Sequence, residues 1–349
     1  MLTSNERAVF EAGELAVVLS QFDLGVIESI TEFPRGSLRS PKVGIVAERG
    51  KFLLKRRCLE WITLERVQFM HRVEDLLARA GFPVARLIAT RAGGTLVQLR
   101  NFFYELFEFV PGQPFQHTVA ETCEAGVLLA RFHHTTERVS PSAAEATPRG
   151  DYHDSAAVRA GLQSIGSRLR SHDSFSGDEA ELAGLVQFLL AAYDNAAQRA
   201  NAVGYGSWAL RLVHADWHPG NLLFRQLRVL AVIDYDLLRY SRRVTDVANG
   251  ALQFSILAGG DPATWPEALD EARFRAFLDG YESMLPLSDE EKNGLVWLMC
   301  EALIAECVGP IAETGSMGRW SGLRILRMVR RKLAWLEANA ERLGMRDNA

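Results

Sequence analysis

Three polar residues within one short region have the types and the spacing that phosphoryl transfer from ATP requires. Residues 214–221 read His-Ala-Asp-Trp-His-Pro-Gly-Asn, which places Asn221 five residues after Asp216. Thirteen residues after Asn221, the run Val-Ile-Asp-Tyr-Asp at 232–236 supplies Asp234. One carboxylate can orient the attacking hydroxyl and accept its proton, while an amide oxygen and another carboxylate hold magnesium against the phosphates. The pattern therefore predicts Asp216 as the catalytic residue and Asn221 and Asp234 as metal ligands.

The catalytic loop of protein kinases, H-R-D-x-x-x-x-N followed by D-F-G, has the same spacing. Here Ala215 replaces the arginine of that loop, and Asp236 occupies the position of the last glycine. Short apolar runs at 210–213, 222–224 and 229–233 predict strands that mount the acidic groups rigidly. Asp, Asn, Pro and Gly also form ordinary turns. The flanking strands and the second aspartate nevertheless favour an active site.

The wider motifs resemble those of the aminoglycoside phosphotransferase and choline kinase superfamily. Residues 214–221 are similar to its H-G-D-x-H-x-x-N box, with Ala215 where the family usually has glycine. Residues 232–236 and 245–248 (Thr-Asp-Val-Ala) resemble its I-D-[FW]-[DE] and D-[LV]-A boxes. Residues 129–133 and 80–84 resemble its L-A-x-L-H helix end and its A-G-x-P-V turn. The resemblance runs from about residue 25 to about residue 260.

This resemblance implies a two-lobed α+β fold of the protein-kinase type, with ATP and Mg²⁺ in the cleft between the lobes. We expect residues 1–110 to form a small nucleotide-binding lobe, an antiparallel sheet with one helix. We expect residues 111–349 to form a large, mainly helical lobe that carries the catalytic loop and the acceptor site. In the family, the position of Asp246 supports the catalytic loop from beneath. We expect His214, His218 and Asp236 to be further supporting residues, although Asp236 could be a second metal ligand, a loop anchor or a bystander.

Alternation of apolar residues predicts strands over 25–33, 42–47, 51–55, 95–99 and 102–109, and a helical stripe predicts a helix over 64–80. Lys55 ends a strand just before this helix, where a phosphate-binding lysine belongs, and the resemblance favours it over Arg56 and Arg57. Such a lysine needs a carboxylate from the helix. Glu65 and Glu74 are the candidates, and we prefer Glu74 because it flanks the apolar stripe.

Two further segments are expected to contact the nucleotide. The loop 35–40, which contains Gly36 and Ser37, lies between the first two expected strands and would cover the phosphates, although an ordinary hairpin turn is equally compatible with its single glycine. The segment 104–112 resembles the hinge of the family. There, the backbone of Glu108 and Phe109 could offer hydrogen bonds to the adenine edge.

From residue 113 onward the periodicity predicts helices over 118–137, 156–169, 178–201, 244–258, 264–284, 288–308 and 319–343, with a loop over 141–153. The basic residues of the last helix are most simply a solvated face. Composition fits a soluble enzyme, with 48% hydrophobic and 23% charged residues and a net charge of −4. Nothing in this charge points to nucleic acid or to a membrane surface.

Residues 111–349 carry 24 Lys and Arg against 30 Asp and Glu, a balance that would suit a cationic small-molecule acceptor. Four cysteines without metal-ligand spacing, no signal peptide and no apolar run of about 18 residues predict a reduced, cytoplasmic protein. The sequence contains no indication of the oligomeric state.

Three functions are compatible with these motifs: a small-molecule ATP phosphotransferase like the aminoglycoside, choline and homoserine kinases, a protein Ser/Thr kinase, and a non-catalytic nucleotide-binding scaffold. Only eleven residues separate Asp234 from Asp246, and no Ala-Pro-Glu follows. Protein kinases place their activation segment there. The short connection favours transfer to a hydroxyl, or less often an amine, of a small molecule. Retention of Lys55, Asp216 and both metal ligands disfavours the scaffold.

Overall fold

A computed structural model describes residues 9–33, 40–142, 145, 150–171 and 178–344. The chain divides into two compact units. The first unit combines Met1–Pro114 with Pro141–Ala146 and Leu222–Asp236, and the second contains Phe115–Ser140, Thr147–Asn221 and Leu237–Ala349. The sequence prediction placed one boundary after residue 110, whereas the chain passes between the two units several times. The interleaving arises because Leu222–Asp236 forms a hairpin that packs on the first unit.

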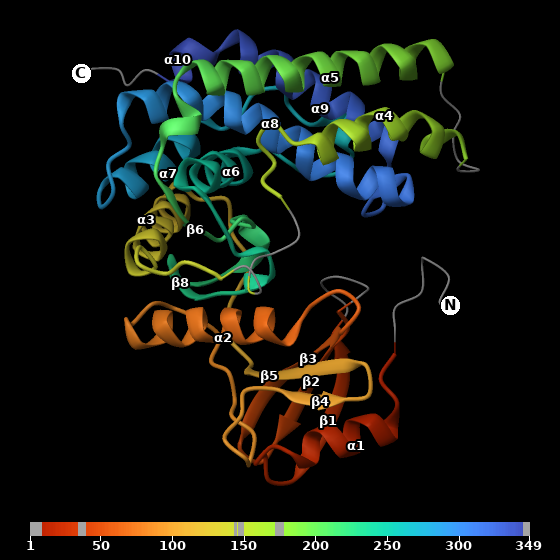
Figure 1. Cartoon of the computed structure of the whole chain (residues 1–349), viewed down its shortest axis with the longest axis vertical. Helices are drawn as coiled ribbons and strands as arrows, with labels where there is room; N and C mark the ends of the chain where they lie inside the picture. The colour runs from red at the N-terminus through yellow and green to blue at the C-terminus, as the bar shows by residue number, and fades with distance from the viewer. Residues whose placement is uncertain (1–8, 34–39, 143–144, 146–149, 172–177, 345–349) are drawn as a thin grey trace. The chain divides into compact units, whose positions relative to one another are not determined.

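A five-stranded antiparallel sheet is the framework of the first unit (Figure 1). Its strands are β1 (Ile27–Phe33), β2 (Lys42–Ala47), β3 (Gly50–Cys58), β4 (Val97–Leu99) and β5 (Phe102–Glu108), in the order β1-β2-β3-β5-β4. β3 pairs with β5 so that Lys55 lies opposite Glu105 and Arg57 lies opposite Phe103. The fold class predicted from sequence, α+β with a small antiparallel sheet, is confirmed.

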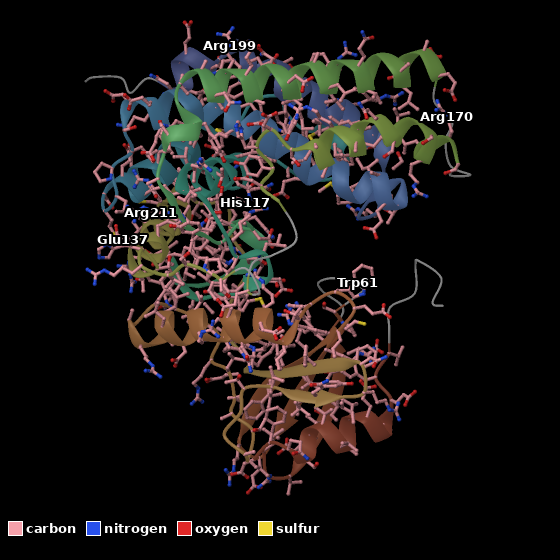
Figure 2. All side chains as sticks on the ribbon, viewed as in Figure 1. Trp61, His117, Glu137, Arg170, Arg199 and Arg211 are labelled. Atoms are coloured by element: carbon pink, nitrogen blue, oxygen red, sulfur yellow. The ribbon has the colours of Figure 1, made fainter. Side chains whose placement is uncertain are left out.

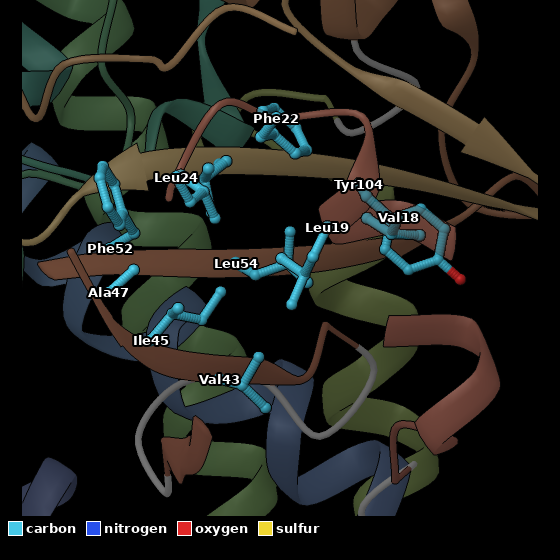
Figure 3. Close-up of a cluster of buried hydrophobic side chains, with 11 residues drawn as sticks. Val18, Leu19, Phe22, Leu24, Val43, Ile45, Ala47, Phe52, Leu54 and Tyr104 are labelled. Atoms are coloured by element: carbon cyan, nitrogen blue, oxygen red, sulfur yellow. The ribbon is translucent and has the colours of Figure 1, made fainter. Parts of the chain in front are cut away.

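Two helices cover opposite faces of this sheet, α1 (Ala12–Ser20) and α2 (Leu64–Arg79) (Figure 1). The predicted helix over 64–80 is α2, which begins after the N-cap Thr63. The sequence prediction of one helix in this region missed α1, which is short and begins with a capping box between Glu11 and Glu14. Val18 and Leu19 of α1 pack with the inward-facing residues of β2, β3 and β5 into one apolar cluster (Figure 3).

The hairpin of β7 (Leu222–Arg225) and β8 (Arg228–Val232) belongs to the first unit. Phe224 exchanges backbone hydrogen bonds with Gln113 at 2.7 and 2.8 Å, and the N–H of Val232 donates to the carbonyl of Pro83 at 2.9 Å. These bonds attach the hairpin to two segments of the first unit. One contains Pro83 and lies between α2 and β4, and the other contains Gln113 and follows β5. The residues that follow β8, Asp234 and Asp236, are therefore carried on the first unit.

The second unit is mainly helical. Its helices are α3 (Val119–Thr135), α4 (Ala156–Arg170), α5 (Glu179–Ala202), α6 (Arg243–Ser255), α7 (Glu271–Glu282), α8 (Asp289–Thr314), α9 (Gly322–Ala338) and α10 (Ala340–Gly344). β6 (Leu210–Val213) pairs with β9 (Arg239–Arg242), and β10 (Ser316–Met317) pairs with β11 (Trp320–Ser321). Arg211 of β6 forms an ion pair of 2.6 Å with Glu137, just beyond α3 (both labelled in Figure 2).

The helix α8 is long and apolar enough, by length and composition, to cross a membrane. The expectation that no segment of the chain reaches this length was therefore wrong. About two thirds of its apolar stretch (67%) is buried inside the fold, against α4, α5, α6 and α9. That burial is what the central helix of a helical core shows.

Candidate active site

The predicted catalytic loop follows β6 in the second unit. The amide nitrogen of Asn221 donates to Asp216 twice, to the side-chain Oδ2 at 2.8 Å and to the backbone carbonyl at 2.9 Å. His218 accepts a hydrogen bond from the N–H of Gly220 at 3.0 Å, and its Nε2 lies 3.5 Å from Asp216 Oδ1. Burial alone would raise the pKa of Asp216, but its hydrogen bond with His218 and the neighbouring polar groups lower it. Asp216 is therefore a carboxylate at neutral pH.

Ala215 has a left-handed backbone, with φ of +63°. This conformation is unfavourable for residues with a side chain and explains why a glycine suits the position. Asp246 of α6 stabilises this backbone conformation. Its carboxylate accepts hydrogen bonds from the N–H groups of His214 and Ala215, both at 2.7 Å. The same carboxylate accepts from His133 Nε2 at 3.1 Å. Burial would raise the pKa of Asp246, but the hydrogen bonds outweigh it and lower the pKa.

We expect Asp246→Ala to destabilise the second unit by about 3–5 kcal/mol, the usual effect of removing one partner of a buried charged pair. Asp246 is 1% exposed, and its loss leaves two backbone N–H groups without their acceptor. Urea unfolding and thermal melts test this expectation, with Asp289→Ala at the exposed start of α8 as the control. A loss below about 1 kcal/mol, the worth of one ordinary hydrogen bond, would show that Asp246 does not support the loop.

In the first unit, Lys55 contacts the two aspartates that follow β8. Its Nζ lies 3.1 Å from Asp234 Oδ1 and 2.9 Å from each carboxylate oxygen of Asp236. Burial and the charge of Arg57 act to lower the pKa of Lys55. The two aspartates outweigh them and raise this pKa above its usual value. Asp234 has a left-handed backbone, with φ of +66°. Lys55 is thus a charged group next to the predicted metal ligand.

Glu74 does not bond to Lys55, contrary to the expected pairing. Glu74 is buried on α2 and lines the same cavity, whereas the other candidate, Glu65, is exposed. Burial and the neighbouring Glu105 raise the pKa of Glu74 well above its usual range. Lys55 is held by Asp234 and Asp236.

Arg57 is a residue of this site that the sequence reasoning missed. It forms a bidentate pair with Asp236 at 2.6 Å for both bonds, and its Nε donates to Glu105. The other oxygen of Glu105 contacts His71 Nε2 at 2.7 Å. On the opposite face of β3, Arg56 contacts Glu14 of α1 at 2.7 Å. The run Lys-Arg-Arg at 55–57 therefore sends its first and third side chains to the site and its second to α1, as strand alternation requires.

A cavity of about 390 Å³ lies beside these residues, and all its lining residues belong to the first unit. Lys42, Lys55 and Arg57 supply its cationic wall, and Glu108 and Phe109 lie at the predicted hinge. The N–H of Glu108 donates to the carbonyl of Arg86 at 2.8 Å, and that of Phe109 to the carbonyl of Lys51 at 2.9 Å. Both donors are therefore already used. The expected phosphate loop with Gly36 and Ser37 lies outside the described residues.

Val110 also lines the cavity, one residue beyond the predicted hinge pair. Within the described chain, its N–H has no backbone acceptor. It is the next hinge donor that an adenine edge could meet, because Pro111 has no N–H.

The donor set fits a hard divalent cation. Magnesium prefers carboxylate and amide oxygens. In the first unit, Asp234 supplies a carboxylate whose one contact among the described residues is the bond to Lys55. In the second unit, the amide nitrogen of Asn221 is held by Asp216, which fixes Asn221 Oδ1 as the end available to a metal.

Glu306 of α8 is a second residue that the sequence reasoning missed. It is half-buried, and its side chain shares a hydrogen bond with Asn249 of α6. Burial, followed by the nearby charge of Asp216, raises the pKa of Glu306 to about 7, while His218 and Arg239 act in the opposite direction. An acid inside an otherwise apolar helix was the signal in the sequence that could have identified it.

The model of the phosphotransferase enzyme family matches residues 29–287 of the chain. The homoserine kinase of Caulobacter vibrioides (strain NA1000 / CB15N) is 27% identical over 308 residues, which cover 87% of this chain and 87% of that protein. The expected superfamily resemblance is thereby confirmed.

Two solved structures have the same fold. A microcompartment-associated aminopropanol kinase matches with a TM-score of 0.69 and 16% identity, over 94% of this chain and 97% of that chain. The amicoumacin kinase hAmiN, solved in complex with AMP-PNP, Ca²⁺ and Ami, matches with a TM-score of 0.66 and 15% identity, over 95% and 94%. At these identities the likeness concerns the fold.

Proposed function

Because the chain belongs to the phosphotransferase enzyme family and is an ATP-dependent small-molecule kinase, we propose that its acceptor is a small alcohol that carries an amino group. The observation that supports this acceptor class is the position of Glu306 near Asp216 in the second unit. A second carboxylate next to the catalytic one is unfavourable unless a cation is present. His218 and Arg239 offset this repulsion only in part, because the pKa of Glu306 is still raised to about 7, and an ammonium group of the acceptor would offset the remainder.

Homoserine, the substrate in the name of the curated relative, is our first candidate acceptor. It combines a hydroxyl, an ammonium and a carboxylate, so its site needs a cation as well as an acid. Arg239, at the start of β9, is the cation that acts on Glu306. Among the described residues no carboxylate pairs with Arg239, which donates a hydrogen bond to the carbonyl of Gly150. A substrate carboxylate is a suitable partner for such a guanidinium.

Further residues are assigned to the binding of the nucleotide and of the metal. Lys55 binds the nucleotide phosphates, with Lys42 and Arg57 in the same cationic wall, and the hinge at Glu108, Phe109 and Val110 binds the adenine edge through the N–H of Val110. Asp234 and Asn221 are the ligands of Mg²⁺, which neutralises phosphate charge when bound.

Asp216 orients the acceptor hydroxyl and takes its proton as the bond to phosphorus forms. Its lowered pKa makes it a weak base, so proton transfer accompanies phosphoryl transfer and does not precede it. His214, His218 and Asp246 hold the loop that presents it.

A panel of acceptors tests the proposal. With Mg²⁺-ATP, we expect homoserine or a related amino alcohol to be phosphorylated and neutral polyols of the same size to be poor acceptors. Phosphorylation of neutral alcohols alone would contradict the amine requirement. Labelling of proteins without turnover of any small molecule would instead support a protein kinase, and nucleotide binding without transfer would support a scaffold.

We expect the efficiency of transfer to an amino alcohol to rise with pH between about 6 and 8, because Glu306, with a pKa of about 7, becomes a carboxylate as the pH increases. Glu306→Gln should remove this rise and increase KM for the acceptor by about 10–100-fold, the range for a lost charged hydrogen bond of ~1.5–3 kcal/mol.

The matched control is Glu290→Gln, an exposed acid of the same helix. KM for ATP should not change in either variant. An unchanged pH profile in Glu306→Gln would remove Glu306 from the acceptor site.

A cytoplasmic location agrees with this function, since ATP is the donor. The four cysteines, Cys58, Cys123, Cys300 and Cys307, are all unpaired. Free thiols of this kind are typical of a reducing compartment.

A further inference from the structure

We propose that Arg57 makes Asp236 a structural anchor and thereby removes it from the metal ligands, so that Asp234 alone supplies a carboxylate of the first unit to the metal. The metal is the one required by the proposed function, and the inference rests on that function in this respect. The motif Asp-Tyr-Asp at 234–236 offers two carboxylates separated by one residue. The contacts of the two side chains differ sharply.

Each carboxylate oxygen of Asp236 is bonded to two cations, Arg57 and Lys55. An ionised carboxylate has about four hydrogen-bond acceptor sites. Arg57 occupies one on each oxygen, with both bonds at 2.6 Å, and Lys55 approaches each oxygen at 2.9 Å. The backbone carbonyl of the same residue accepts from Arg66 of α2 at 3.1 Å. A metal would have to displace these cations before it could reach the carboxylate.

Arg57 is itself fixed in place, so it cannot easily release Asp236. It is 6% exposed, and its Nε is bonded to Glu105, which is 1% exposed. Glu105 is held in turn by His71, whose Nδ1 lies 2.7 Å from Thr95 Oγ1. A planar guanidinium that bridges two carboxylates in this way is a rigid link. The chain of contacts therefore attaches the turn at 234–236 to β3 and β5.

Asp234 is held much less firmly. Among the described residues its side chain makes one contact, the 3.1 Å bond to Lys55. Lys55 has a flexible stem and a single charged atom, so it can move to a phosphate. Arg57 then still holds both oxygens of Asp236, whereas Asp234 is left available to the metal. When Lys55 moves, Arg57 and Asp236 still neutralise each other's charge through their bidentate pair. The geometry thus separates an anchoring aspartate from a metal-binding one within three residues.

Metal binding measured without turnover tests the assignment. Mn²⁺ is titrated against the full-length protein, with and without AMP-PNP, and the free ion is followed by electron paramagnetic resonance. We expect Asp236→Asn to retain the wild-type Mn²⁺ affinity within about twofold, because a residue that is not a ligand contributes little to it. Asp234→Asn should weaken binding by at least about tenfold. A tenfold loss in Asp236→Asn would overturn the proposal.

Removing the arginine gives the complementary test. Arg57→Met should release Asp236 and tighten Mn²⁺ binding by about fivefold or more, since an unpaired carboxylate becomes available. Arg57→Met/Asp236→Asn should lose this gain. The matched control is Arg56→Met, which removes the neighbouring arginine from the opposite face of β3. An Arg57→Met protein with native circular dichroism and unchanged Mn²⁺ affinity would contradict the proposal.

Arg57→Met/Glu105→Gln serves if the single variant does not fold, because it removes the second buried acid that Arg57 neutralises. The same gain in Mn²⁺ affinity is expected, and its absence counts against the proposal. None of these measurements requires an acceptor. If no amino-alcohol substrate were found, the assignment of the metal ligands would therefore still stand. If Asp236 proved to bind the metal, the proposed kinase activity would still stand.

Discussion

Asp216→Ala should reduce phosphoryl transfer by about 10²–10⁴-fold, the usual contribution of a positioned acid–base group, and leave nucleotide binding nearly unchanged. The side chain of Asp216 belongs to the second unit, whereas the residues that line the nucleotide cavity belong to the first. Its contacts in the structure are to Asn221 and His218. The loss should therefore occur in kcat and not in the affinity for ATP.

Rapid-quench assays and isothermal titration with AMP-PNP separate these two quantities. Asp75→Ala, an exposed residue of α2, is the control for a general effect of losing a carboxylate. Equal losses of rate and of nucleotide affinity would show that Asp216 acts on the nucleotide side. Wild-type turnover in Asp216→Ala would remove it from the mechanism altogether.

Asp234→Asn should weaken metal-dependent nucleotide binding by about 10²-fold, or ~2.7 kcal/mol, because a charged oxygen ligand is replaced by a neutral one. Asn221→Ala should have a smaller effect on affinity, since an amide oxygen contributes no formal charge. Titration of AMP-PNP at several Mg²⁺ concentrations measures both.

The control is the same titration without divalent metal. There the affinity of Asp234→Asn for AMP-PNP should equal or slightly exceed that of the wild type, because one negative charge has been removed. The assignment of the ligands fails if Asn221→Ala is the more damaging change. It also fails if the loss in Asp234→Asn persists when no metal is present.

The elements that local pattern determines were largely predictable from the sequence. Strand alternation located β2, β3 and β5, and the apolar stripe with Gly81 after it located α2. The second unit's long helices followed from periodicity in the same way. α1 was missed because nine residues give too little periodicity to stand out, although its buried Val18 and Leu19 lie at helical spacing from Leu15.

Partner choice among charged residues was not predictable. The sequence shows that Lys55, Arg57, Glu74, Asp234 and Asp236 exist, but not which of them are close enough to pair. The register Lys55–Glu105 and the turn after β8 decide that Arg57 pairs with Asp236 and that Lys55 contacts the two aspartates. The proximity of Glu306 to Asp216 was likewise not predictable, because it depends on how α8 packs. Such contacts depend on tertiary packing and lie outside any local pattern.

The interleaved chain path has a consequence for synthesis on the ribosome. Domains generally fold in order as they emerge, at about 5–20 residues per second. The first unit is complete only when the hairpin at 222–236 is available, and that segment is made well after Pro114. The early sheet must therefore wait roughly 6–25 s at those rates with the contacts of Gln113 and Pro83 to the hairpin still missing. During that interval Lys55 and Arg57 lack the carboxylates of Asp234 and Asp236, and the pair of Arg57 with Glu105 is the contact of this group that the early sheet can already form.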